Sequence, residues 1–132
     1  MTPFVPALLV MHADLAAALL RAAEKVYGPI EGVEAITNEG QSRDSLEREI
    51  GRRAKGWEHG GLVLTDFWGG SCHICGATAT RGLGPIAIVT GVNLPLLLDY
   101  LHNRGQLEAL ALAERLLRKG QESIRIQRGD IT

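Results

Sequence analysis

The chain has 132 residues, and its 14 lysines and arginines against 15 acidic residues leave a formal net charge of −1. This length suits one domain with one core, so we expect a single domain over residues 1–132, and the balanced charge argues against nucleic-acid binding. With no apolar stretch near the roughly 20 residues that cross a bilayer, and no signal-peptide pattern at the N-terminus, we expect a cytoplasmic protein.

The first predicted elements are a buried strand and a helix. Residues 7–11 form a continuous apolar run, which is typical of a strand buried on both faces, and the run ends on His12. A helix is expected to follow and to end at Gly28, with an inner face formed by Leu15, Leu19, Ala22, Ala23 and Val26. The histidine is therefore expected between the end of a strand and the start of a helix.

The next predicted elements lead to a second polar side chain. Residues 33–37 alternate like a strand, and Ser42 is a suitable N-cap for the helix that follows. The apolar spacing of that helix predicts an inner face formed by Leu46, Ile50 and Ala54. After a turn at residues 56–60, an apolar run over residues 61–65 predicts another buried strand, which ends on Asp66.

A glycine-rich loop follows this second polar residue. Residues 67–71 are expected to lead into a short helix, which residues 82–85 interrupt before a strand over residues 86–89. Asn93 is a candidate N-cap for the next helix. The inner face of that helix is expected to consist of Leu94, Leu97, Leu98 and Leu101.

The C-terminal part predicts one more helix and one more strand. The helix is expected from about residue 106 to residue 119, ending at Gly120, and residues 123–127 alternate like an edge strand. The order β-α-β-α-β-α-β-α-α-β is typical of a three-layer α/β/α domain. Because right-handed crossovers make the first strands parallel, we expect a mostly parallel sheet of four parallel strands plus a C-terminal antiparallel edge strand.

The polar residues at the strand ends predict a common site. Ligands of open parallel sheets bind at the carboxyl ends of the strands, near the point where the strand order reverses. His12 and Asp66 each follow a predicted buried strand, and the loop containing Gly69, Gly70 and Ser71 precedes a helix. An imidazole, a carboxylate and anion-binding amides are therefore expected to lie together.

Three segments of the chain resemble one protein family. They are the junction of the first strand with His12, residues 63–71 and residues 91–97. Over nearly the whole chain the sequence is similar to the enzyme IIA proteins of the mannose family, from the bacterial phosphoenolpyruvate-dependent sugar phosphotransferase system (PTS). The resemblance implies that His12 accepts a phosphoryl group from phospho-HPr and passes it to an enzyme IIB, with Asp66 as the supporting residue. It also implies a homodimer in which the last strand, here residues 123–127, pairs with the partner's sheet, and a membrane link only through a IIC/IID transporter.

The chemistry of these side chains agrees with phosphoryl transfer. A neutral imidazole has one nitrogen lone pair that can attack phosphorus, and Asp66 would hold the proton of the other ring nitrogen. The amides of Gly69, Gly70 and Ser71 at a helix start, together with the Ser71 hydroxyl, would bind the phosphate oxygens. Such a site requires no metal and no cofactor.

Several positions near the predicted site allow more than one interpretation. Asn93 and Trp68 are candidate accessory residues, although Asn93 suits a helix cap better and Trp68 suits an exposed loop or an interface equally well. Met11 and Ala13 flank the histidine where many members of the family have a small hydroxyl residue and a glycine. The first change removes a hydrogen bond that could reach the phosphate, and the second narrows the backbone freedom beside it.

The sequence also carries a CxxC motif, Cys72 to Cys75, with His73 inside it. A helix start lowers the pKa of a thiol, so a thiol–disulfide site is one alternative function. A metal site is another, because His12, Asp66, Cys72 and His73 are all competent ligands. A third alternative keeps the phosphorylation site but makes the protein a regulatory module that senses phosphorylation without its own sugar transporter.

Overall fold

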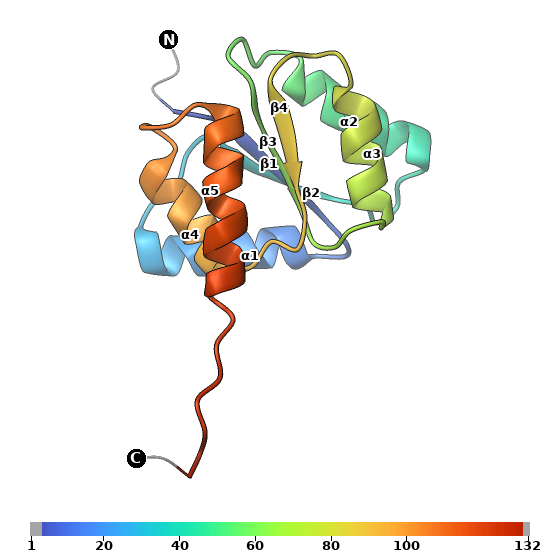
Figure 1. Cartoon of the computed structure of the whole chain (residues 1–132). Helices are drawn as coiled ribbons and strands as arrows, with labels where there is room; N and C mark the ends of the chain where they lie inside the picture. Colours follow the sequence, from blue (N-terminus) through green and yellow to red (C-terminus); the bar gives the residue numbers. More distant parts are fainter. Residues whose placement is uncertain (1–3, 131–132) are drawn as a thin grey trace.

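The computed structural model describes residues 4–130, in which helices and strands alternate along the chain (Figure 1). The strands and helices of the first half are β1 (Ala7–Met11), α1 (Leu15–Tyr27), β2 (Val33–Thr37), α2 (Arg43–Ala54) and β3 (Gly61–Thr65). Those of the second half are α3 (Ser71–Thr80), β4 (Ile86–Val89), α4 (Leu94–Asn103) and α5 (Ala109–Glu122). Of the helices within residues 4–130, none is both long enough and apolar enough for a bilayer crossing.

The four strands form one parallel sheet in the order β2-β1-β3-β4, which confirms the predicted parallel core. β1 pairs with β2 on one side and with β3 on the other, so the strand order reverses between β1 and β3. In this register Val10 lies opposite Thr65, and the carboxyl ends of the two central strands are neighbours. The residues that follow them, His12 and Asp66, are thereby brought to the same edge of the sheet.

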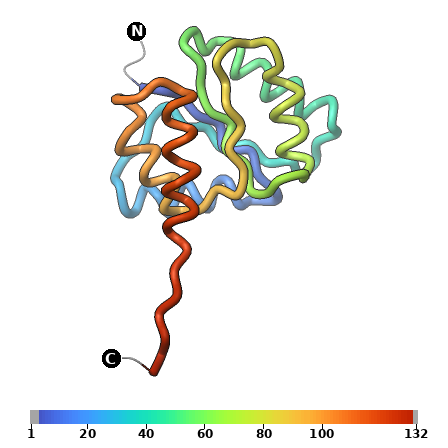
Figure 2. The backbone as a smooth tube through the Cα atoms, in the orientation of Figure 1, coloured from blue at the N-terminus to red at the C-terminus, as the bar shows by residue number. Residues whose placement is uncertain are grey.

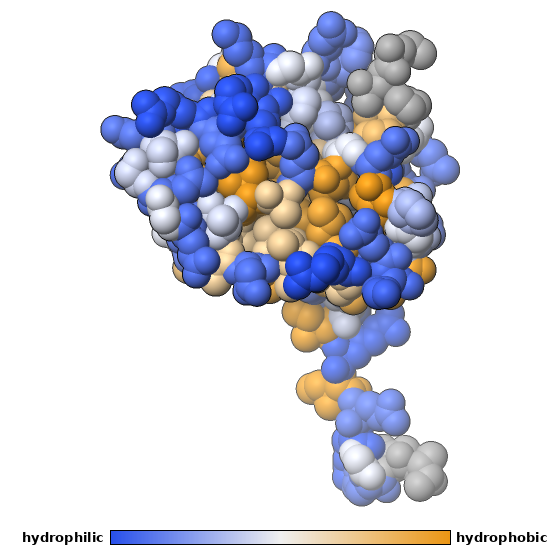
Figure 3. All heavy atoms as spheres, turned by 180° about the vertical axis from the view of Figure 1, so that it is seen from behind, coloured by the Kyte–Doolittle hydropathy of each residue, from blue (hydrophilic) through white to orange (hydrophobic). Residues whose placement is uncertain are grey.

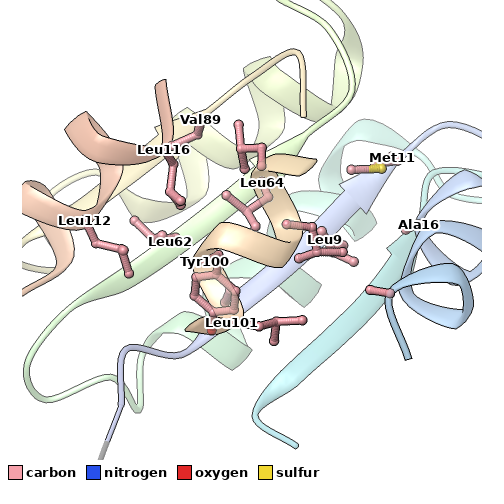
Figure 4. Packing of buried hydrophobic residues seen from close by; sticks show 14 of the residues in the cluster. Leu9, Met11, Ala16, Leu62, Leu64, Val89, Tyr100, Leu101, Leu112 and Leu116 are labelled. Atoms are coloured by element: carbon pink, nitrogen blue, oxygen red, sulfur yellow. The ribbon is translucent and has the colours of Figure 1, made fainter. Parts of the chain in front are cut away.

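Helices cover both faces of the sheet, as the three-layer prediction requires. α1, α4 and α5 cover one face, and α2 and α3 cover the other (Figure 1). Successive strand residues point to opposite faces, so Leu9 and Leu64 pack against α4 and α5 (Figure 4), whereas Leu8 and Val63 pack under α2 and α3. This explains why β1 and β3 are buried throughout and consist mostly of apolar residues.

Three helices differ in detail from their predicted form. The buried residues of α4 are Leu96, Leu97, Tyr100 and Leu101, so its predicted inner face is confirmed at two positions, whereas Leu94 and Leu98 are only partly buried. On α1 the predicted inner face is confirmed at Ala23, which is buried, and at Leu19, which packs against the core, but it is wrong at Leu15 and Val26, which are 44% and 65% exposed. Ala16, which was not predicted, is buried instead of Leu15. α5 continues past Gly120 instead of ending there. A Cβ on Gly120 would lie 2.9 Å from Cδ1 of Leu96, so this glycine allows α5 to approach α4 closely rather than terminating a helix.

The predicted C-terminal edge strand does not form within the single chain. Residues 123–127 form no strand, and they lead away from the body as a tail that starts at the end of α5 (Figure 2). Ile124 is 78% and Ile126 is 94% exposed, and apolar atoms are visible on the tail (Figure 3). The alternating pattern indicates an extended backbone, but a strand also requires a sheet edge beside it, and the tail points away from the sheet.

Candidate functional site

His12 and Asp66 are in direct contact at the carboxyl end of the sheet. Oδ2 of Asp66 accepts a hydrogen bond from the backbone N–H of His12 at 3.0 Å and lies 2.8 Å from Nδ1 of the ring. The opposite ring nitrogen, Nε2, lies 3.4 Å from Oγ of Ser71. The structure therefore brings together three of the residues singled out in the sequence and fixes the orientation of the imidazole.

The environment of Asp66 keeps its carboxyl group ionised. Burial of this side chain, which is 11% exposed, would by itself raise its pKa, but the hydrogen bonds from the backbone and ring of His12 outweigh burial and lower the pKa below its ordinary value. An ionised carboxylate only accepts hydrogen bonds. Nδ1 of His12 must therefore carry the proton in this pair, which leaves the lone pair of a neutral ring on Nε2.

The loop after β3 supplies fewer free amides than the sequence led us to expect. The amide of Gly69, predicted as a phosphate donor, already donates to Nδ1 of His73 at 2.9 Å. α3 begins at Ser71 with Gly70 as its N-cap, and no side chain caps it. Because the first amides of a helix have no acceptor within the helix, the amides of Gly70 and Ser71 remain available as donors beside the His12 ring.

Phe67 belongs to the site, and sequence reasoning missed it. Its ring stacks on His12 with a centroid distance of 4.9 Å and an interplanar angle of 28°. A Cβ on Gly70 would lie 2.6 Å from Cζ of Phe67 and 3.1 Å from Cε1 of His12, so the glycine makes room for both rings. The sequence offered one signal for including Phe67 in the site, which is that it directly follows Asp66.

The two candidate accessory residues make other contacts. Trp68 is 77% exposed and its ring lies 4.2 Å from that of His73. Oδ1 of Asn93 accepts from the amide of Leu96 at 3.0 Å, which caps α4, and its Nδ2 donates to the Gly120 carbonyl and the Ser123 hydroxyl. Asn93 therefore acts as a helix cap that also ties α4 to the end of α5.

The backbone beside His12 is held by residues from the end of β2. Ala13 has a φ of 52°, in the left-handed region that favours glycine. Its amide donates to Oδ1 of Asn38 at 3.1 Å, and its carbonyl accepts from Oγ1 of Thr37 at 2.5 Å. Met11, on the other side of the histidine, is fully buried in the core. The sequence gave no sign of the bonds from Thr37 and Asn38 to Ala13, because they join the ends of two strands that are distant along the chain.

The cysteines do not have the environment of a thiol–disulfide site. Cys72 and Cys75 are free and buried. Burial and the charge of Asp66 raise the pKa of Cys72 to about 11, and burial and Glu47 raise the pKa of Cys75. Burial and the nearby carboxylates therefore outweigh the lowering of the thiol pKa that the helix start was expected to cause, and a reactive thiolate is disfavoured.

A potential metal-binding cluster is present beside the imidazole. His12, Asp66 and Cys72 each offer a ligand atom, and these atoms lie within 4.8 Å of one another. His73, also expected in such a cluster, instead accepts the amide hydrogen of Gly69 and packs against Trp68. The sequence prediction of four converging ligands thus reduces to three.

Several solved structures of similar shape are described as PTS components. A phosphotransferase system component EIIA from Streptococcus agalactiae superposes with a TM-score of 0.86 at 22% identity, covering 92% of this chain and 96% of that one. A PTS IIA protein associated with the fucose utilization operon of Streptococcus pneumoniae gives 0.82 at 24% identity, covering 96% of both chains. The mannose/sorbose specific IIA subunit from Enterococcus faecalis gives 0.79 at 21% identity, covering 98% of this chain and 99% of that one.

Comparison of the sequence itself identifies the family. A search of curated proteins found no match. A family model described as the PTS system fructose IIA component matches residues 7–127, which include every strand and helix of the fold. The chain therefore belongs to the fructose/mannose family of IIA components of the phosphotransferase system.

Proposed function

We propose that this protein is a phosphocarrier that accepts a phosphoryl group from phospho-HPr on Nε2 of His12 and passes it to an enzyme IIB component. The observation that carries the proposal is the 2.8 Å contact between Nδ1 and Oδ2 of Asp66, which leaves Nε2 as the free nucleophile beside Ser71. In the transfer a bond forms between Nε2 and phosphorus while the bond from phosphorus to HPr breaks. The proton on Nδ1 stays in place.

The surroundings of the imidazole suit this transfer. As the nitrogen–phosphorus bond forms, the ring gains positive charge, which the Asp66 carboxylate stabilises. The amides of Gly70 and Ser71 and the Ser71 hydroxyl face the incoming phosphate oxygens. A helix N-terminus contributes only about 0.3–2 kcal/mol, so these contacts orient the phosphoryl group and add little to the nitrogen–phosphorus bond that must break when the group is passed on.

We further propose the partners that the family role implies. The chain acts as one cytoplasmic domain, requires no metal or cofactor for transfer, and reaches a membrane only through a IIC/IID transporter. It forms a homodimer in which the exposed tail after α5 pairs with the partner's sheet. Ile124 and Ile126 give that tail apolar side chains that the partner would cover.

The test is phosphorylation in a reconstituted relay. The protein is incubated with labelled phosphoenolpyruvate, enzyme I and HPr, and the label is expected to be stable in alkali and labile in acid. His12→Ala should abolish the label, whereas His59→Ala, which changes a histidine on the exposed turn before β3, should retain it. Label that survives in His12→Ala would remove the proposed nucleophile.

A further inference from the structure

We propose that His12, Asp66 and Cys72 form a Zn²⁺ site, and that zinc and the phosphoryl group exclude one another at this imidazole. The metal site stands on the cluster itself, whereas its effect on transfer rests on the proposed function. The consequence is a carrier whose capacity to accept phosphate depends on whether zinc is bound.

The three ligands come from separate elements that the fold brings together. His12 follows β1, Asp66 follows β3, and Cys72 lies in the first turn of α3. Their ligand atoms lie within 4.8 Å of one another. Tetrahedral zinc, with bonds of about 2.0–2.3 Å, places its ligands roughly 3.5 Å apart, so a small side-chain adjustment closes the set.

Asp66 provides an independent indication that a cation belongs here. Its Oδ2 is used by His12, but its Oδ1 is buried and has no hydrogen-bond partner among residues 4–130. A buried carboxylate oxygen without a donor is unfavourable. A metal ion bound between Asp66 and Cys72 would satisfy it.

The donor set selects zinc over harder cations. An imidazole nitrogen, a carboxylate oxygen and a thiolate sulfur are a borderline-soft combination, whereas Mg²⁺ and Ca²⁺ prefer oxygen ligands only. When zinc binds, a zinc–sulfur bond replaces the S–H bond of Cys72, and the proton leaves to solvent. Three protein ligands leave a fourth position for water, on the side where the His12 side chain is 34% exposed.

Competition with the phosphoryl group follows from the electron pairs of the ring. A neutral imidazole has one protonated nitrogen and one free lone pair. If zinc takes Nδ1, the ring proton moves to Nε2, and if zinc takes Nε2, the nucleophilic lone pair is used directly. Conversely, phosphorylated His12 has phosphorus on Nε2 and a proton on Nδ1, so no lone pair remains for zinc. The exclusion is therefore reciprocal.

The first experiment measures binding on the full chain under reducing conditions. Zinc is titrated by calorimetry, and Co²⁺ is used as a coloured substitute whose thiolate charge-transfer band reports a metal–sulfur bond. The wild type is expected to bind one ion and show the band, while Cys72→Ala and Cys72→Ser lose the band and bind zinc roughly 100-fold or more weakly, since even outer-shell changes cost about 10–100-fold.

Cys75→Ala is the matched control. This residue is the other buried cysteine of α3, and it lies outside the cluster. Unchanged zinc affinity in both Cys72 variants would overturn the proposal, and so would equal loss in Cys75→Ala, which would assign the metal to the CxxC pair. Two substitutions at Cys72 are used because the test needs only one of them to fold, and the circular dichroism spectrum of each variant shows whether it does.

The second experiment tests competition. Zinc-loaded wild type should accept little label from phospho-HPr until a chelator is added, and the phosphorylated protein should give no Co²⁺–thiolate band. Cys72→Ala should accept label whether or not zinc is present. If zinc binds but does not slow labelling, the exclusion is wrong. If no labelling occurs even without metal, the proposed function fails, while the Co²⁺ band still decides on the site.

Discussion

Oδ2 of Asp66 binds His12 twice, through the backbone amide at 3.0 Å and through Nδ1 of the ring at 2.8 Å. One carboxylate oxygen therefore fixes both the position of the histidine backbone and the rotation of its ring. Holding the ring in one tautomer is the contribution that an aspartate makes in a catalytic triad. This double contact gives Asp66 a testable role as the positioning residue.

Asp66→Asn should slow phosphorylation of His12 by roughly 100-fold or more, because the loss of the negative charge removes the preference for the Nδ1–H tautomer. The rate of label transfer from phospho-HPr measures the effect. Asp14→Asn is the matched control, since Asp14 is an exposed carboxylate at the start of α1 whose side chain makes no cap bond. Equal rates for wild type and Asp66→Asn would reduce Asp66 to a structural residue.

The stability of the protein should depend on pH through Asp66. Because the folded-state pKa of this group is below its ordinary value of 3.8, the ionised form stabilises the fold. Its contribution is complete above that ordinary value and is lost as the pH falls below it, toward the folded-state pKa. The difference in free energy of unfolding between wild type and Asp66→Asn should therefore be smaller at pH 3 than at pH 6, as measured by urea unfolding. A difference of the same size at both pH values would contradict this.

Gly70→Ala should impair transfer more than stability. The new Cβ would lie within 2.6 Å of the Phe67 ring, which is 51% exposed and can move aside. This movement would disturb the stacking of Phe67 on His12. We expect the transfer rate to fall roughly 10- to 100-fold, in line with misplacements on the order of 1 Å, with little change in melting temperature. Gly56→Ala, where a Cβ meets nothing within 4 Å, should change neither. A large drop in melting temperature for Gly70→Ala would show that the glycine matters for folding instead.

Ala13→Gly should stabilise the protein by about 0.5–1 kcal/mol. Ala13 has a φ of 52°, and glycine adopts this conformation without the steric cost that an L side chain incurs, although it also adds freedom to the unfolded chain. Ala17→Gly within α1 is the control and should destabilise by about 1 kcal/mol. Urea unfolding measures both, and a loss of stability for Ala13→Gly would mean that the bonds from Thr37 and Asn38 already offset the strain.

The double substitution Ile124→Ser and Ile126→Ser should convert the proposed dimer into a monomer. These side chains are 78% and 94% exposed in the single chain, so their replacement costs the isolated fold almost nothing. Light scattering after gel filtration gives the mass. Val26→Ser, at an exposed apolar position on α1, is the control and should leave the mass unchanged. An unaltered dimer in the double variant would exclude the tail as the contact.

The sequence predicted the central strands well because burial on both faces leaves a clear pattern. The runs before His12 and Asp66 are fully buried, as their composition implied. The inner face of α1 was predicted only in part: Ala23 enters the core as expected, but at the start of the helix Ala16 is buried while the larger Leu15 stays exposed. The prediction favoured the larger apolar residue over its small neighbour, which was the wrong choice at this end of the helix.

The candidate site was predictable where it depends on strand ends and not where it depends on packing across loops. His12 and Asp66 could be found from the ends of apolar runs. The stacking of Phe67 and the diversion of the Gly69 amide to His73 could not, because both are set by the path of one loop in three dimensions. Sequence patterns specify elements, whereas such contacts depend on how a loop closes over its neighbours.

The pairing of Val10 with Thr65 has a consequence for how this protein tolerates change. His12 and Asp66 follow this last pair of the two strands within two residues, so the strand register fixes the spacing of the main-chain positions that carry the imidazole and the carboxylate. The position and length of the outer helices can change in evolution while that spacing stays constant. A fold of this kind can change the surfaces that contact its partners without changing the spacing of the histidine and the aspartate.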